Sequence, residues 1–140
     1  MKEVKKEKAQ KTEAEEERQE ELENDVLTVQ EATKISDGVH SGEIMNIVHE
    51  NREGFDYIDV YIGIVDDNDN NVTIKTGFPA YVSLNSSLGR FLTAADIDFK
   101  PKDKLKLSDV KELVTGKTIT FQTYTEDNFA RIVNKTIKFD

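Results

Sequence analysis

The sequence predicts an all-β domain of five short strands, with one helix between the third and fourth strands and a charged extension in front. Three observations predict it. Residues 55–65, FDYIDVYIGIV, alternate aliphatic side chains with polar or aromatic ones, as a half-buried strand does. Clusters of turn-forming residues divide most of the remaining chain after Gly38 into similar short segments. Residues 85–96 switch to a helical period.

The first 25 residues form the extension, and residues 26–140 form the domain. Residues 1–24 consist almost entirely of Lys, Glu, Gln, Ala and Arg, and Val4 and Leu22 are their only large aliphatic residues after Met1. Such a segment cannot bury enough apolar surface to offset the entropy of ordering it. We therefore expect a low-complexity tail that is disordered or a fraying helix. In residues 27–38, Thr28 and Glu31 have the spacing of a capping box, which predicts a short helix ending before Asp37.

The first two strands follow directly. Residues 38–50 form the first strand, which Gly42 allows to bend and in which the Ile44 to Ile47 spacing indicates a bulge. Residues 51–54 form a turn, and residues 55–65 form the second strand. Its buried face carries the aliphatic side chains at even positions, which are Ile58, Val60, Ile62 and Ile64.

The third strand spans residues 72–78, with Val72, Ile74 and Thr76 facing inward, and Pro79 ends its ladder. Asn85 or Ser86 caps the helix that follows. The buried face of that helix carries residues at positions i, i+3, i+4 and i+7, which are Leu88, Phe91, Leu92 and Ala95.

A lysine-rich connector, residues 100–107, leads to a predicted helical turn at 108–114. Residues 117–124 and 129–139 are the last two strands, joined by the tight turn TEDN. A three-stranded meander, a helix and a final hairpin in this order are typical of the OB-fold, a partly open five-stranded barrel. A small β-sandwich is the alternative.

In an OB-fold, the outer surface of strands two and three binds oligonucleotides or oligosaccharides. Tyr57 and Tyr61 have outward parity on strand two and are roughly 13 Å apart, which suits two stacked bases of a single strand. The candidate nucleic-acid-binding residues with outward parity are Tyr57, Tyr61, Lys75, Gln122, Tyr124 and Arg131. Alternatively, the tyrosines pack beneath a helical tail or simply cover the barrel.

Several charges oppose such a site. The whole chain carries a formal net charge of −9, which argues against binding by bulk charge alone. We expect Asp59, Glu126 and Asp127 to repel phosphate and to keep the site local. The one basic cluster of the domain either follows a phosphate backbone or is a solvated connector; it comprises Lys100, Lys102, Lys104 and Lys106.

Other chemistry is poorly supported. The chain has no cysteine, and neither of its two histidines, His40 and His49, is adjacent to a candidate nucleophile. Asp67, Asp69 and Asn71 begin like a calcium loop, but Val72 and Phe78 replace its glycine and its bidentate glutamate. We therefore predict no enzyme activity, no cofactor and no metal. We read neither a signal peptide nor a membrane span, so the expected location is the cytoplasm.

Residues 27–139 resemble the small OB-fold single-stranded DNA-binding proteins of phages and mobile elements. The likeness lies in VQEATKISDGVHSGEI, DYIDVYIGI, FPAYVSLNSSLGRFL and VTGKTITFQTY followed by FARIV. It implies sequence-tolerant binding of single-stranded DNA in replication or recombination, in the host cytoplasm if the chain is phage-encoded, with Tyr57, Tyr61 and Tyr124 as stacking residues. Such proteins often carry their acidic tail at the C-terminus, whereas here the charged tail is N-terminal and the domain itself is acidic.

Two other functions fit the same aromatic face. One is a protein-interaction or virion structural domain that does not bind nucleic acid, and a weaker one is a carbohydrate-binding module. The tail regulates DNA binding, recruits replication or recombination proteins, or only keeps the protein in solution.

Overall fold

The computed structural model describes residues 26–29 and 32–140. The chain divides into two units, Met1–Glu31 and Ala32–Asp140. In the first unit only residues 26–29 are described; they are neither helical nor β, and Val26, Leu27 and Val29 are exposed. The predicted tail, residues 1–25, and Glu31 of the predicted capping box lie outside the described residues.

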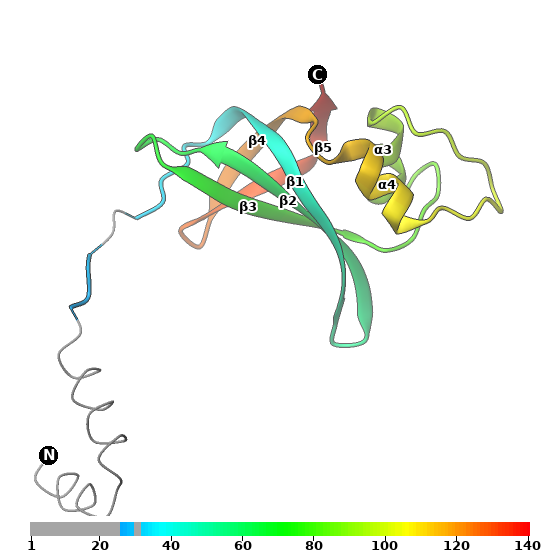
Figure 1. The fold of residues 1–140 in the computed structure, drawn as a ribbon, viewed down its shortest axis with the longest axis horizontal. Coiled ribbons are helices and arrows are strands. Elements are labelled where there is room, and N and C mark those ends of the chain that lie inside the picture. The colour runs from blue at the N-terminus through cyan, green and yellow to red at the C-terminus, as the bar shows by residue number, and fades with distance from the viewer. Residues whose placement is uncertain (1–25, 30–31) are drawn as a thin grey trace, which may run out of the picture. The chain divides into compact units, whose positions relative to one another are not determined.

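The second unit is a five-stranded antiparallel sheet with two short helices (Figure 1), as the sequence predicts for an all-β chain. Its strands are β1 (Gly38–Arg52), β2 (Phe55–Val65), β3 (Asn71–Pro79), β4 (Thr118–Glu126) and β5 (Phe129–Phe139). They lie in the order β3-β2-β1-β4-β5. The meander and the final hairpin are therefore joined through β1, which pairs with β2 along residues 43–52 and with β4 along residues 38–43.

The passage of β1 from one partner to the other depends on Gly42 and on a bulge. A Cβ at Gly42 would lie 2.6 Å from Cγ2 of Ile62, so only glycine lets β1 approach β2 this closely. The β1–β2 register shifts between Ile44 and Asn46, which confirms the predicted bulge. Together they bend the strand at the point where its partner changes.

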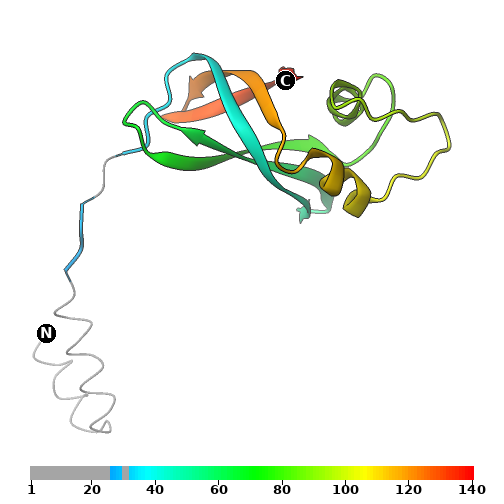
Figure 2. The same cartoon turned by 45° about the horizontal axis from the view of Figure 1, so that its top comes forward.

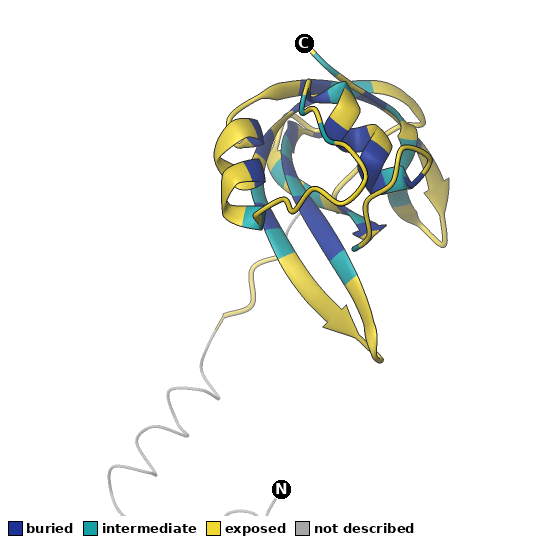
Figure 3. Ribbon diagram, turned by 90° about the vertical axis from the view of Figure 1, so that its right-hand side faces the viewer, coloured by how far each residue is buried: buried dark blue, intermediate teal, exposed yellow. Residues whose placement is uncertain are grey.

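In Figure 1 the β1–β2 hairpin projects downward from the sheet, and the β4–β5 hairpin ends at its lower left; Figure 3 shows the long β1–β2 hairpin reaching below the rest of the unit. The turn of the β1–β2 hairpin is Glu53-Gly54 (φ 53° and 84°), and that of the β4–β5 hairpin is Asp127-Asn128 (φ 51° and 66°). Two central residues with positive φ match the twist of the strands that they join. Arg52, which the sequence placed in the turn, is instead the last residue of β1, so the hairpin is longer than predicted.

The edge strands β3 and β5 approach each other without forming a ladder, so the sheet is not closed into a barrel. Their contact runs through Asn134 of β5. Its Nδ2 donates to the carbonyl oxygen of Gly77 at 3.1 Å, and Thr76 Oγ1 donates to its Oδ1. These side-chain bonds satisfy polar groups at an edge that would otherwise lack partners.

The core lies on the concave face of the sheet, beneath α3 (Ser87–Ala94) and α4 (Leu107–Val114). Figure 2 shows the two helices grouped at one end of the sheet. The predicted inward residues of β2 are buried, and so is the predicted face of the first helix. Val72 and Ile74 of β3 and Ala130 and Ile132 of β5 are partly buried against this core.

The predicted short helix before β1 is wrong for the described residues. Residues 32–37 are irregular, and their polar groups bond to two distant elements instead of to one another. On one side, the N–H of Asp67 donates to the Lys34 carbonyl at 2.7 Å. On the other side, Thr123 Oγ1 donates to the Ser36 carbonyl at 3.0 Å, and Ile35 is buried between them. Local spacing cannot reveal such long-range partners. Among the described residues, no helix is long and apolar enough to cross a membrane.

Candidate nucleic-acid interface

The outer face of β2 carries the side chains at its odd positions. These are Phe55, Tyr57, Asp59 and Tyr61, which alternate with the buried aliphatic residues. Tyr57 and Tyr61 are half-buried, whereas Phe55, at the projecting end of the hairpin, is 68% exposed. In the next strand, Lys75 lies directly opposite Tyr61. The structure thus places Tyr57, Tyr61 and Lys75 on one surface of neighbouring strands.

The structure corrects the expectation that Asp59 repels phosphate, because Asp59 does not present its charge to solvent. The residue is completely buried. Its carboxylate accepts two hydrogen bonds from the Arg52 guanidinium, at 2.6 Å from Nη1 and 2.8 Å from Nη2. These bonds, and to a smaller extent the charges of Arg52 and Lys75, hold the pKa of Asp59 below its usual value despite its burial. Asp59 is therefore ionised and neutralised, and it does not repel a phosphate as a free carboxylate would.

Space for this ion pair comes from the absence of a side chain on β3. Gly77 lies directly opposite Asp59 in the β2–β3 ladder. A Cβ there would be 2.9 Å from Asp59 Oδ1 and 3.1 Å from Arg52 Nη2. Lys75 adds a second positive charge, with its Nζ 3.8 Å from Asp59 Oδ2. The pairing Asp59–Gly77 thus lets two cations converge over the middle of the face.

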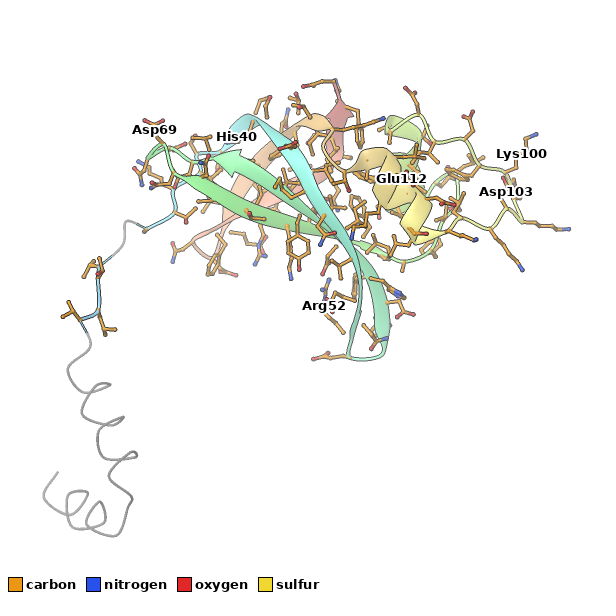
Figure 4. All side chains as sticks on the ribbon, in the orientation of Figure 1. His40, Arg52, Asp69, Lys100, Asp103 and Glu112 are labelled. Carbon is orange, nitrogen blue, oxygen red and sulfur yellow. The ribbon has the colours of Figure 1, made fainter. Side chains whose placement is uncertain are left out.

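Arg52 also stacks on Tyr57. Its guanidinium carbon lies 4.5 Å from the centre of the Tyr57 ring, which is cation–π distance. The Arg52 side chain remains 43% exposed while two of its nitrogens are bound to Asp59. The guanidinium is thus held between the Asp59 carboxylate and one face of the Tyr57 ring, and both Arg52 and Tyr57 keep part of their surface exposed (Figure 4 labels Arg52 on this hairpin).

The sequence interpretation missed Arg52 and Phe55 as members of this face. Arg52 was assigned to the turn, because nothing local shows that β1 extends that far. Phe55 did carry a signal: it has the same parity as Tyr57 and Tyr61, so the alternation already placed it on the outer face.

The remaining predicted residues lie on the other hairpin. Tyr124 of β4 pairs with Arg131 of β5, and Gln122 precedes Tyr124 on the same face; all three are exposed. The exposed Phe129 begins β5, and the Arg131 guanidinium carbon is 5.9 Å from its ring centre. In the sheet, β1 separates this group from Tyr57 and Tyr61. The structure thus forms two aromatic and basic groups, one on each projecting hairpin, and does not bring all six candidates into one cluster.

The lysine-rich connector belongs to neither group. It links α3 to α4, and Figure 4 shows Lys100 and Asp103 well away from Arg52, at the helical end of the unit. The backbone N–H of Lys100 donates a hydrogen bond to the Asp103 carboxylate at 2.8 Å, so a bond within the loop itself holds its conformation. It is not positioned to extend the face formed by β2 and β3.

The turn between β2 and β3 is organised by a buried carboxylate. Asp66 accepts backbone N–H groups from Asn68 and Asn70, at 3.0 and 2.9 Å, and from Lys34 at 3.3 Å. These bonds lower the pKa of Asp66. Within the described part of the chain, no group of three or more His, Cys, Asp or Glu side chains is arranged to hold a metal ion.

No protein-family model matches this chain, and a search of curated proteins finds no match to it.

Proposed function

We propose that this protein binds single-stranded DNA without sequence preference, in replication or recombination, through the outer face of β2 and β3. The observation that carries the proposal is the grouping of Arg52, Tyr57 and Tyr61 on the outer face of β1 and β2. Rings offer a π-face that every base can stack on, so binding of this kind tolerates sequence. Arg52 and Lys75 supply local positive charge in a domain that is acidic as a whole.

The strand order supports an OB-fold as the architecture of this site. In the OB-fold, β1 is shared between a meander and a final hairpin, as it is here. The seam of the proposed barrel lies between β3 and β5, where the Asn134 side chain bridges the edges. In that fold, the loops that join β1 to β2 and β4 to β5 flank the nucleic-acid groove, and here each of these hairpins carries an exposed phenylalanine next to its turn, Phe55 and Phe129 respectively.

Oligonucleotide titration of ring-deletion variants tests the proposal. Tyr57→Ala and Tyr61→Ala each weaken binding of fluorescent oligo-dT by roughly 1–3 kcal/mol, because each removes one stacking platform. Tyr57→Phe and Tyr61→Phe are the matched controls: they keep the ring and lose only the hydroxyl, so their affinity stays close to that of the unmodified protein. Circular dichroism establishes that all four variants are folded.

Two outcomes would reject the proposal. If the folded Tyr57→Ala/Tyr61→Ala double variant binds oligo-dT as tightly as the unmodified chain, the face does not stack bases. If the unmodified chain does not bind oligo-dT even at low salt, the same surface is better explained as a protein-interaction or virion structural face.

A further inference from the structure

At the helical end, two loops enclose an apolar cleft that is separate from the β2–β3 face. One loop, residues 80–86, precedes α3, and the other, residues 99–107, comprises the latter part of the connection between α3 and α4 and the first residue of α4. Two cavities of about 240 and about 480 Å³ adjoin there and share Val82 and Leu105 in their linings. The first extends inward to Ile58, Leu92 and Val110 of the core. The second lies between the two loops.

Several aliphatic side chains that line the cleft remain exposed to solvent. Leu84 is 67% exposed, and Val82 and Leu105 are 41% and 39% exposed. All three line one or both cavities. Isolated exposed leucines are common on protein surfaces, but three that line one continuous hollow indicate a binding surface.

The rim of the cleft is positively charged. The 99–107 loop contains four lysines and one acid, Asp103, whose carboxylate is bonded to the backbone of the same loop. No ion pair formed by the described residues involves Lys100, Lys102, Lys104 or Lys106. On the opposite rim, Asp56 lies 3.2 Å from His49 and accepts a hydrogen bond from Asn51, which lowers its pKa. The loop charge is therefore free to meet an anionic ligand.

The cleft and the β2–β3 face use opposite sides of the same hairpin. His49 and Ile58 pair directly across β1 and β2, and both line the cleft. Arg52 and Tyr57 stack on the other side. A ligand in the cleft therefore does not need to displace a strand of DNA from the tyrosines.

We propose that this cleft binds an acidic peptide segment of a partner protein, with aliphatic side chains in the two cavities and carboxylates facing the lysine loop. The chemistry favours a peptide over DNA, because the most exposed apolar side chain of the lining, Leu84, is aliphatic, whereas Phe91 is buried and Phe99 packs against the core, so neither ring is presented as a stacking platform. It also favours a peptide over a fatty acid, because an acyl chain is normally enclosed over most of its surface, and this cleft is open. The proposal is independent of DNA binding.

Fluorescence polarisation with a designed probe tests the proposal on the full chain. The probe is a fluorescein-labelled peptide of about twelve residues in which Leu and Ile recur every third or fourth position among Asp and Glu. A second peptide replaces every Leu and Ile with Ser and keeps the charge. We expect saturable binding of the first peptide with a Kd in the micromolar range, and at least about tenfold weaker binding of the second.

Variants locate the binding site. Leu84→Asp places a carboxylate among the aliphatic side chains and weakens probe binding at least about tenfold. Lys102→Glu/Lys104→Glu weakens it and flattens its salt dependence, because the screened attraction is lost. Lys135→Glu/Lys138→Glu, which reverses two exposed lysines of β5, is the charge-matched control and leaves probe binding unchanged.

Several outcomes would contradict the proposed peptide binding. Absence of saturable binding, equal binding of the serine peptide, or no effect of Leu84→Asp in a folded variant would each overturn the proposal. Displacement of the probe by oligo-dT, together with equal loss of DNA and peptide binding in Lys102→Glu/Lys104→Glu, would assign the lysine loop to nucleic acid instead.

Discussion

A buried carboxylate on the outer face of a sheet would normally be costly, because water no longer solvates its charge. At Asp59 the cost is offset by two hydrogen bonds from one guanidinium, for which Gly77 leaves the room. The alternation of residues 55–65 predicted which side chains share a face with Asp59. It could not predict that Asp59 would be buried, since this depends on Arg52 reaching back from another strand and on a glycine across the ladder.

Removing the guanidinium should destabilise the fold. In Arg52→Gln, Asp59 loses its bidentate partner and retains only Lys75, 3.8 Å away. We expect the free energy of unfolding to fall by about 1–3 kcal/mol, below the usual cost of breaking a fully buried pair because Arg52 is partly exposed. Urea denaturation measures this change. Lys75→Gln is the control and should cost clearly less; equal stability of Arg52→Gln and the unmodified chain would mean that the pair contributes nothing.

The same ion pair predicts a pH dependence. The folded-state pKa of Asp59 is lowered, so its contribution to stability is fully present above its unfolded pKa, about 3.9, and is lost as pH falls through the folded value. Asp59→Asn removes this contribution. The stability difference between the unmodified chain and Asp59→Asn is therefore largest at neutral pH and shrinks on acidification, as urea denaturation across pH would show. A difference that grows toward low pH would contradict the pKa direction.

At the scale of elements, the sequence predicted the β1 bulge, the buried face of α3 and all five strands, because each of these has a local pattern. The sequence predicts Asn85 or Ser86 as the N-terminal cap of α3, and in the structure the cap is Ser86. Its Oγ accepts hydrogen bonds from the N–H of Gly89 at 2.9 Å and from the N–H of Ser83 at 3.0 Å. A Cβ at Gly89 would lie 1.7 Å from the Ser83 carbonyl oxygen. The choice of cap thus depends on a tight loop packed against the helix, which no spacing rule describes.

Ser86→Ala should destabilise the protein by about 1–2 kcal/mol, because a buried hydroxyl that satisfies two backbone N–H groups is lost. Asn85→Ala, at the exposed neighbouring position, should have little effect on the melting temperature. Thermal unfolding of both variants distinguishes the two caps. Equal losses would mean that Asn85 also caps the helix.

The projecting β1–β2 hairpin carries a prediction of its own, which rests on the proposed DNA binding. Phe55 extends the face of Tyr57 and Tyr61 toward the tip and has no role in the core. Phe55→Ala should therefore weaken oligo-dT binding by about 1–3 kcal/mol and leave the melting temperature unchanged. Phe55→Tyr keeps a ring and serves as the control. Unchanged DNA affinity in Phe55→Ala would confine the site to the two tyrosines.

At the scale of the whole molecule, no local sequence pattern predicts that β1 pairs with both β2 and β4. Segments 38–43 and 118–123 are about eighty residues apart in the sequence and form one ladder. Residues 32–37 illustrate the same limit. Their spacing favoured a helix, but the β2–β3 turn on one side and β4 on the other hold them in an irregular path.

This irregular segment predicts where the chain can be shortened. A chain that begins at Asp25 keeps residues 32–37 and should melt within a few degrees of the full protein, because residues 1–24 offer almost no apolar surface to bury.

A chain that begins at Gly38 loses the buried Ile35 and the bonds from Thr123 and Thr125 to residues 36 and 37. Its melting temperature should fall by about 10 °C, since burial of one isoleucine alone stabilises by about 1.5–3 kcal/mol. Ile35→Ala in the full chain separates the apolar from the polar contribution and should account for most of that fall. Equal melting temperatures of the Gly38 and Asp25 chains would show that residues 32–37 do not stabilise the sheet. A large fall in the melting temperature of the Asp25 chain would show that residues 1–24 support the fold.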